Sequence, residues 1–527
     1  MFCVVGSGPA GVACAHALLR AGAKVTLLDA GLELEPQRRE RLAALQRLSP
    51  RDWDQASLSF IRDGVTVAAG GIPMKLAYGS RFPYREPVDL PITRDGVEGQ
   101  PSFAQGGLSN VWGASVLPFR TEDMNGWPIT AEDLKPHYRA VLEVMPFSAR
   151  HDRLEAAFPL YHDRPGDLNA SSQAAAFLGD LEAAHATLLA HGVRFGASRL
   201  AVQGSADGRG GCVYCAQCMY GCPYGYIYNS SQTLDRLRAH PAFDYRPGAL
   251  VEQVSELGAE VELRGRNLED GTPLRLRAEG VFLACGALST ARVLLASLEA
   301  YEHPVQAADN CYFLLPLLRY RQQAGATRES LHTLAHVFLE IVDPEVGPHT
   351  SHLQIYTYNE LFREQVRNLL GPAAGVLGAA VERALLGRML LIQGYLHSDL
   401  SPGIRLTLQR GSPGHAARLA LSVEPNATTR PALAALQRRL WAERRSMRAI
   451  PLSPAMRVGK PGRGFHTGGT FPMRSQPKPF ETDSLGRPYG FSRVHLVDAS
   501  VFPTLPATTI TLSVMANAHR IGAGAAA

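Results

Sequence analysis

Three glycines at the start of the chain have a spacing that could bind phosphate. Gly6, Gly8 and Gly11 form the pattern G-x-G-x-x-G directly after four apolar residues. In this pattern the first glycine permits a tight turn, the second lets a pyrophosphate approach the backbone, and the third lets a helix pack close to the preceding strand. The N–H groups at the start of that helix would bind the phosphates, and Asp29 would bind ribose hydroxyls. These residues predict a site for an adenine dinucleotide.

A second chemical pattern lies in one short segment that holds half of the eight cysteines. They stand as C-x2-C-x2-C-x3-C before a proline, at Cys212, Cys215, Cys218 and Cys222. This is the spacing of the bacterial ferredoxin run, in which thiolates wrap an iron–sulfur cluster. No second run is present, so a three-cysteine or an unusual four-cysteine cluster would fit. A structural loop of thiols or disulfides and a zinc site are the alternatives that the spacing leaves open.

The elements that must position the glycines form a β-α-β unit at the N-terminus. An apolar strand over residues 2–5 is followed by a helix and by a second strand over residues 24–28, which ends at Asp29. Another apolar strand, a glycine and a helix over residues 280–292 predict that the chain returns to this nucleotide-binding unit. The sequence therefore favours a parallel sheet assembled from distant segments.

The middle of the chain has a different pattern. Residues 150–205 have helical periodicity. Residues 300–460 alternate helices with strand-like segments, which lie at 394–400, 404–408 and 419–423. We assign this stretch to a second, substrate-facing domain. Because side chains alternate along a strand, three residues of the first segment would share one face and are candidate pocket residues: Tyr395, His397 and Asp399.

The composition excludes several classes of protein. The chain has 527 residues, of which 46% are hydrophobic and 19% charged, as in ordinary globular proteins of two or three domains. The net charge of +5 is small, and a cluster of arginines at 438–448 has the spacing of a solvated helix face, so no nucleic-acid partner is expected. The most apolar stretch, 369–391, contains proline and charged residues, so no transmembrane segment is expected. A strand beginning at residue 2 leaves no room for a signal peptide and predicts a cytoplasmic location.

Motifs near the C-terminus complete a set that spans nearly the whole chain. Residues 465–474 read FHTGGTFPMR, residues 494–503 read VHLVDASVFP, and the run that starts at Thr511 predicts a final helix. Other motifs are the N-terminal glycines, a glycine-dense loop at 106–113, the sequence Gly126-Trp127-Pro128 and a turn at 284–290. With these motifs in this order, the chain resembles the glucose–methanol–choline (GMC) oxidoreductases. Residues 300–460 carry little of the resemblance.

The resemblance implies an FAD bound in an extended pose, covalently or not. The glycines would hold its pyrophosphate, and Asp29 its adenosine ribose, where the family usually has glutamate. The resemblance places Ser109 and Asn110 beside the isoalloxazine ring and the backbone near Val251 beside the adenine. It places Asp498 and Ala499 at the phosphate and ribityl region, and Thr511 and Leu512 at the pyrimidine edge of the flavin.

His466 matches the active-site histidine of the family. Hydride transfer from an alcohol to flavin requires that the hydroxyl proton be removed as the C–H bond breaks, and a neutral imidazole can act as that base. The family usually has a second histidine or asparagine just before the final Thr-Leu, and here Thr509 stands at that position. A threonine hydroxyl forms hydrogen bonds but does not share proton transfer as an imidazole does. We therefore expect either His466 as the base with Thr509 as a positioning residue, or a different redox reaction.

The sequence thus predicts an α/β protein, α+β in its second domain. A Rossmann-like FAD-binding domain would cover residues 1–299, with inserted helical and cysteine-rich segments at about 126–235. A substrate-binding domain built on an antiparallel sheet would cover 300–464, and residues 465–527 would return to the first domain with the active-site motif.

The expected activity is that of an FAD-dependent oxidoreductase, which oxidises a C–OH group of a sugar-like or lipophilic alcohol to a carbonyl. One alternative is desaturation or another non-alcohol redox step on a biosynthetic intermediate, and another is a catalytically silent electron-transfer flavoprotein. If the cysteines hold a cluster, electrons would leave one at a time to an acceptor protein or a quinone. Without a cluster, oxygen or a small acceptor is expected, and this distinction separates a dehydrogenase from an oxidase.

Overall fold

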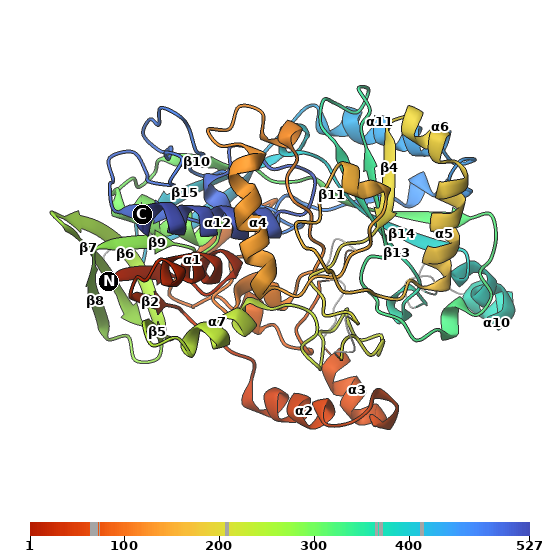
Figure 1. Cartoon of the computed structure of the whole chain (residues 1–527), viewed down its shortest axis with the longest axis horizontal. Helices are drawn as coiled ribbons and strands as arrows, with labels where there is room; N and C mark the ends of the chain where they lie inside the picture. The colour runs from red at the N-terminus through yellow and green to blue at the C-terminus, as the bar shows by residue number, and fades with distance from the viewer. Residues whose placement is uncertain are drawn as a thin grey trace.

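The chain folds around two large β-sheets that lie side by side (Figure 1). The computed structural model describes residues 1–63, 72, 74–205, 210–363, 367, 373–411 and 416–526. Both termini lie in the part that holds the parallel sheet, and the antiparallel sheet forms the opposite part. The first and last segments of the chain therefore build one unit together.

The parallel sheet has the strand order β19-β9-β1-β2-β5, and every neighbouring pair is parallel. The strands are β1 (Phe2–Val5), β2 (Val25–Leu28), β5 (Phe243–Arg246), β9 (Gly280–Leu283) and β19 (Val494–Leu496). The strands β2 and β9 are fully buried and apolar except for Thr26, because both faces of such a sheet are covered. Beside it, α12 (Thr511–Ala526) packs against α1 (Pro9–Arg20) and α4 (Ala131–Val144).

The antiparallel sheet has the order β17-β11-β14-β13-β12-β4, and β18 also pairs with β11. Its strands are β4 (Val193–Ala197), β11 (Tyr312–Arg319), β12 (Val337–Ile341), β13 (Ser351–Tyr356), β14 (Met389–Tyr395), β17 (Ala449–Pro451) and β18 (Arg457–Val458). One face of this sheet packs on α5 (Ser172–Ala183) and α11 (Thr429–Ala442), which share an apolar core with the strands. Part of the other face packs in a smaller apolar core that includes Phe338 and Tyr356, and part of it lines a cavity.

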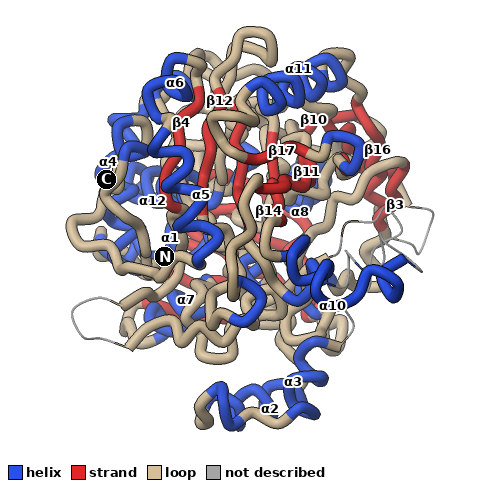
Figure 2. Tube along the Cα trace, turned by 90° about the vertical axis from the view of Figure 1, so that its right-hand side faces the viewer, coloured by secondary structure: helices blue, strands red, loops and turns tan. Residues whose placement is uncertain are grey.

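The remaining elements connect or flank these sheets. A four-stranded sheet contains β10 (Pro304–Ala307), β15 (Gly403–Gln409), β16 (Arg418–Glu424) and β3 (Ile92–Asp95), and a three-stranded sheet contains β6 (Ala249–Leu257), β7 (Glu260–Asn267) and β8 (Pro273–Ala278). The other helices are α6 (His185–Ala190), α7 (Ser230–Arg238), α8 (Ala287–Ser297) and α10 (Ala373–Leu386). In Figures 1 and 2, α2 (Pro36–Gln46) and α3 (Gln55–Arg62) project from the main body.

The predicted fold class is confirmed, with a parallel Rossmann-like unit and an antiparallel sheet. Two local predictions are wrong. Residues 150–205 do not stay helical, because β4 alternates inward and outward side chains at the edge of the antiparallel sheet. The strand predicted at 394–400 ends at Tyr395, so His397 and Asp399 lie in or beside a short 3-10 turn, Ser398–Leu400, rather than on one strand face. In the stretch 369–391, residues 369–372 lie outside the described residues.

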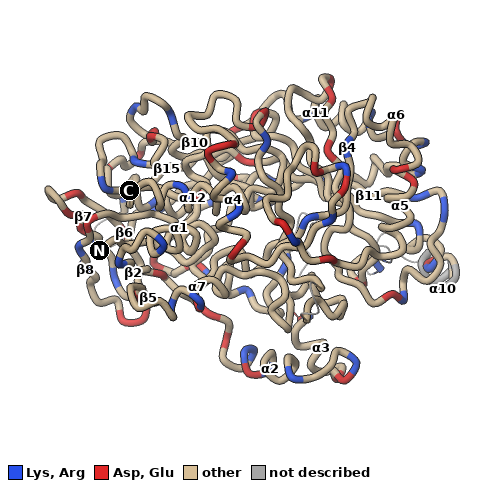
Figure 3. The backbone as a smooth tube through the Cα atoms, viewed as in Figure 1, with Lys and Arg blue, Asp and Glu red and all other residues tan. Residues whose placement is uncertain are grey.

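Acidic and basic residues are interspersed along the backbone trace (Figure 3). Two arginines of the basic cluster, Arg438 and Arg439, lie on α11 and form ion pairs with Glu345 and Asp343 at 3.6 and 2.6 Å. Among the described residues, no helix combines the length and the apolar character needed to cross a membrane.

Candidate active site and cofactor groove

The N-terminal glycines form the turn between β1 and α1. Gly6 has a φ of +102°, a backbone conformation that residues other than glycine rarely adopt. A Cβ on Gly11 would lie 1.9 Å from the carbonyl oxygen of Gly6, so only glycine lets the helix start this close to the strand. A Cβ on Gly8 would meet no protein atom within 4 Å, and this residue faces a cavity. The turn therefore leaves open space at the N-terminus of α1, where a phosphate fits.

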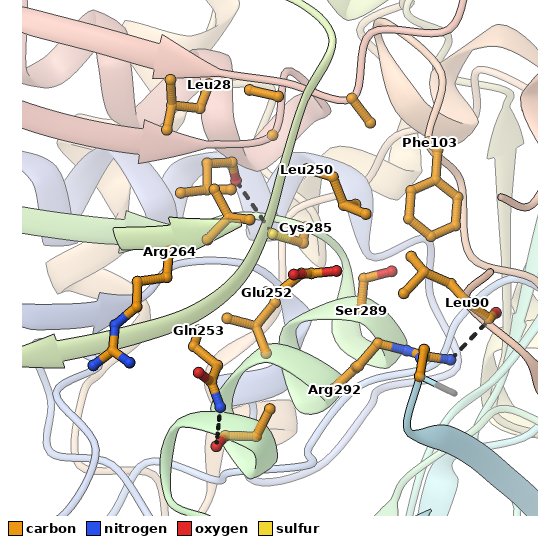
Figure 4. A pocket seen from close by; sticks show the side chains of 18 of the residues that line it. Leu28, Leu90, Phe103, Leu250, Glu252, Gln253, Arg264, Cys285, Ser289 and Arg292 are labelled. Carbon is orange, nitrogen blue, oxygen red and sulfur yellow. Dashed lines mark hydrogen bonds between the residues drawn. The ribbon is translucent and has the colours of Figure 1, made fainter. Parts of the chain in front are cut away.

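Two adjoining cavities make a groove over the carboxyl ends of the parallel strands. One has a volume of about 290 Å³ and is lined by side chains that include Phe103, Glu252 and Arg292 (Figure 4). The other has a volume of about 200 Å³. Gly6, Asp29 and Cys285 are among the residues that line both cavities, which therefore adjoin each other. A groove of this length, at this edge of a parallel sheet, fits an extended dinucleotide.

Most residues predicted to contact the cofactor line this groove. Val251 lies in the first cavity, and the second is lined by Gly6, Gly8, Asp29, Asp498, Ala499 and Thr511. Gly11, Ser109, Asn110 and Leu512 do not line the groove, and of these four only Ser109 lines the third cavity described below. The Asn110 amide instead donates to the carbonyl oxygens of Gln105 and Gly107, and Leu512 is buried in the core.

Two buried carboxylates hold the groove together. Asp29 accepts hydrogen bonds from the Ser7 hydroxyl and from Tyr245 OH, and burial raises its pKa to about 6. Asp498 accepts from the Gly286 N–H at 2.8 Å, and burial likewise raises its pKa. Asp498 thereby ties the end of β19 to the turn between β9 and α8.

A third cavity, of about 270 Å³, adjoins the groove and lies against the face of the antiparallel sheet opposite α5 and α11. Pro9, Leu108, Phe465 and Thr511 line both this cavity and the groove. The predicted residues His466, Thr509 and Ser109 line it, together with Tyr395 from the end of β14. The fold thus brings the candidate base beside the end of the groove. His397 and Asp399 do not line it.

The tautomer of His466 is set by Asn310, a residue that sequence analysis did not single out. The Asn310 amide nitrogen donates to the carbonyl oxygens of Leu396 and Leu505, at 2.9 and 3.1 Å. Its carbonyl Oδ1 must then accept from His466, whose Nδ1 lies 3.2 Å away. With the proton on Nδ1, the lone pair of His466 is on Nε2. Asn310 therefore prepares His466 to accept a proton.

The surroundings of His466 also keep its imidazole neutral. Burial lowers its pKa to about 3. The ring of Tyr395 stacks on the His466 ring with 4.6 Å between centroids. Such an apolar contact favours the uncharged ring, because a buried charge would lose its hydration.

Thr509 is anchored at the wall of the same cavity. Its hydroxyl oxygen accepts a hydrogen bond from the Leu117 N–H at 3.0 Å. The hydroxyl proton remains available as a donor, so Thr509 can offer one hydrogen bond to a ligand. It has no ring nitrogen with which to share a proton transfer.

The four clustered cysteines line one small cavity, together with His332 and Leu334. All four are free thiols. Backbone N–H groups point at the sulfurs: Thr333 N lies 3.4 Å from Cys218 Sγ, and Tyr226 N lies 3.3 Å from Cys222 Sγ. Leu334 also lines the active-site cavity, so one side chain separates the two cavities.

Comparison with known proteins places these observations in a family. Residues 426–518 match the family model of the GMC oxidoreductases, and residues 4–34 match that of NAD(P)-binding Rossmann-like domains. No curated protein sequence matches the chain. A solved structure, pyridoxine 4-oxidase from Mesorbium loti, is similar in fold, with a TM-score of 0.58 and 16% identity over 99% of this chain and 98% of that one. The C-terminal match, the Rossmann-like start and the shared fold make the chain similar to the GMC oxidoreductases, and together they support an FAD-dependent oxidoreductase that acts on CH–OH donors.

Proposed function

We propose that the chain oxidises an alcohol to a carbonyl compound, with His466 as the base. The observation that carries this proposal is the position of His466, held by Asn310 and neutral, in a cavity that adjoins the dinucleotide groove. In this proposal, residues 1–299 and 465–527 hold the cofactor, and residues 300–464 cover the substrate. The solved structure of similar fold is that of a pyridoxine 4-oxidase, which is consistent with a small-molecule substrate.

The groove fits FAD because Gly8 leaves open space at the N-terminus of α1 and Asp29 lines both of the adjoining cavities. When bound, FAD supplies the acceptor for the hydride. The residues of the chain handle the proton: His466 Nε2 removes it from the substrate hydroxyl, and Nδ1 keeps its own proton on Asn310 Oδ1. The Thr509 hydroxyl donates a hydrogen bond that orients the substrate oxygen. The substrate carbon is thereby left to lose its hydride.

The test is anaerobic reduction of the flavin by a panel of primary alcohols. Wild-type protein should bleach the flavin absorbance, and His466→Ala should slow this by at least about a hundredfold, in line with the loss of a general base. Asn310→Leu should keep its FAD and slow the reaction by a similar factor, because the tautomer is no longer fixed. Unchanged rates in both variants would show that His466 is not the base, and a flavin that no alcohol bleaches would favour desaturation or an electron-transfer role.

We further propose that Cys212, Cys215, Cys218 and Cys222 hold an iron–sulfur cluster. The four sulfurs share one cavity, and Tyr214 and Ala216 between them adopt positive φ angles, which turn this short loop around the cavity. Backbone N–H groups also reach the sulfurs of Cys212 and Cys215, and such bonds stabilise thiolates. Burial raises the pKa of both thiols to about 12, so a bound cation is needed to ionise them.

The spread of the sulfurs favours a cluster over a single zinc ion. Zinc–sulfur bonds of about 2.3 Å require sulfurs about 3.8 Å apart. Within the described part of the chain, no three of these sulfurs lie within 4.8 Å of one another. His332, 3% exposed, lines the same cavity, and its Nδ1 has no hydrogen-bond partner. A cluster spaces its cysteine ligands more widely, because each binds a different iron.

The cluster is tested by iron and acid-labile sulfide assays on anaerobically purified protein. We expect about three or four irons per chain. Cys218→Ser should lose iron, and Cys14→Ala, at a buried cysteine of α1, should retain it. A chain that holds zinc, or no metal, would contradict the proposal and would point to oxygen or a small acceptor instead of an acceptor protein or a quinone.

A further inference from the structure

Four neighbouring strands place one row of polar side chains across the sheet behind the active-site cavity. In register, Glu340 of β12 pairs with His352 of β13, His352 with Tyr395 of β14, and Tyr395 with Tyr312 of β11. In a nearby row on the same face, Gln354 pairs with Gln393. A strand slip of one residue would turn these side chains away, so the register fixes the row.

Glu340 and His352 form a buried pair at one end of this row. They are 1% and 0% exposed, and Glu340 Oε1 lies 2.5 Å from His352 Nδ1. Because a carboxylate only accepts hydrogen bonds, the Nδ1 of His352 carries the proton. Its Nε2, with a lone pair, then accepts from the Gln354 amide nitrogen at 3.2 Å. The carboxylate therefore decides which way the Gln354 amide points.

The amide oxygen of Gln354 accepts from two hydroxyls that line the active-site cavity. They are those of Ser115, at 3.2 Å, and Tyr356, at 3.3 Å. Since both hydroxyl protons point at Gln354 Oε1, the oxygens of Ser115 and Tyr356 are left with lone pairs only. This end of the cavity therefore presents hydrogen-bond acceptors to a ligand.

The walls around these acceptors are largely aromatic. Trp112, Tyr312, Phe362 and Tyr395 line the cavity beside Tyr356. Flat rings gain both apolar burial and stacking against such walls. The cavity thus combines a surface for a ring with a cluster of fixed acceptors.

We propose that Glu340 and His352 are positioning residues that, through Gln354, make the site select ring-bearing alcohols with a second hydrogen-bond donor on the ring. This inference rests on the proposed alcohol oxidation. It names the substrate class as hydroxyl- or amino-substituted arylmethanols, and it assigns to Ser115 and Tyr356 the contact with the second donor.

The test compares 3-hydroxybenzyl alcohol with benzyl alcohol in the FAD-bound protein. We expect wild type to prefer the hydroxylated compound by about tenfold or more in kcat/KM, the worth of one or two hydrogen bonds. Glu340→Gln should bring this ratio close to one. The glutamine amide can donate a hydrogen bond to His352 Nδ1, so the proton of His352 is no longer held on that nitrogen and the Gln354 amide is no longer held in one orientation. Gln354→Leu should do the same, while Glu340→Asp should restore part of the preference. Glu345→Gln, at an exposed glutamate of the same sheet region, should leave the ratio unchanged.

Binding separates this inference from the activity itself. The dissociation constants of both compounds, measured by perturbation of the flavin absorbance without oxygen, should show the same preference in wild type and lose it in Glu340→Gln. If neither alcohol is oxidised but the binding preference holds, the proposed reaction fails and the selectivity stands. Equal binding of both compounds by wild type, or a ratio that survives Gln354→Leu, would overturn the inference.

Discussion

At the residue scale, the charge of His466 follows from what surrounds it. The ring is buried beside Tyr395, its Nδ1 faces the Asn310 carbonyl, and its pKa is lowered to about 3. An ordinary histidine has a pKa of about 6.5 and would be half protonated near neutral pH. His466 therefore keeps its lone pair at neutral and mildly acidic pH.

We predict that kcat/KM for alcohol oxidation has no acid limb near the ordinary histidine pKa. Since the lowered pKa keeps the base neutral, the rate should stay constant as the pH falls from about 8 to about 5. The pH profile of anaerobic flavin reduction measures this. A rate that halves near pH 6.5 in a protein that is still folded would contradict the neutral imidazole.

Sequence reasoning reached some of these residues and not others, for a physical reason. The glycines, Asp29 and His466 belong to short contiguous motifs, so their spacing indicates their use. Asn310 lies 156 residues from His466, and only the fold brings the two together. Gln354 likewise gains its orientation from Glu340 on a neighbouring strand. Pairings across strands leave no local pattern in a single sequence.

At the element scale, two glycines in the turn between β1 and α1 have different roles, one in cofactor binding and one in helix packing. Gly8 borders the open groove, and Gly11 contacts the protein itself. We predict that Gly8→Ala keeps the fold and weakens FAD binding by about tenfold or more, because its Cβ would fill phosphate space. Gly11→Ala should instead prevent stable folding, since the Cβ overlaps the Gly6 carbonyl. Flavin content and thermal unfolding of both variants measure this, and a folded, fully loaded Gly11→Ala would contradict it.

Three histidines lie where α1, α4 and α12 meet. The ring of His519 lies 5.5 Å from that of His16 and 5.1 Å from that of His137, measured between centroids. Burial lowers the pKa of His137 to about 4 and that of His519 to about 3, and Arg20 or Arg520 nearby adds to the shift. The packed helices therefore require neutral rings.

This packing predicts a loss of stability in mild acid. The unfolded chain takes up protons on these rings below about pH 6.5, while the folded chain does not until about pH 4. Stability is thus fully present above pH 6.5 and is lost as the pH falls towards 4. The melting temperature against pH should fall less steeply in His519→Leu than in wild type. Parallel curves for the two proteins would show that other groups govern the acid response.

At the scale of the whole molecule, the cofactor groove joins segments from both ends of the chain. Its lining comes from the first turn, from β6, from the turn after β9 and from the start of α12. We predict that removing FAD lowers the melting temperature, because ligand at about 1,000 times its dissociation constant stabilises the folded state by about 4 kcal/mol. Thermal unfolding with and without added FAD measures this, and equal melting temperatures would argue against the groove as the cofactor site.

The strand order of the parallel sheet has a consequence for synthesis on the ribosome. β1 is made first, yet its neighbour β9 begins at Gly280, and the strand that covers β9, β19, begins at Val494. Domains generally fold as they emerge, but this one lacks its edge strand until Val494–Leu496 have been made. The nascent chain must therefore carry an incomplete apolar sheet throughout the synthesis of residues 284–493, and chaperones that shield such surfaces should raise its yield more than that of proteins whose first domain is contiguous.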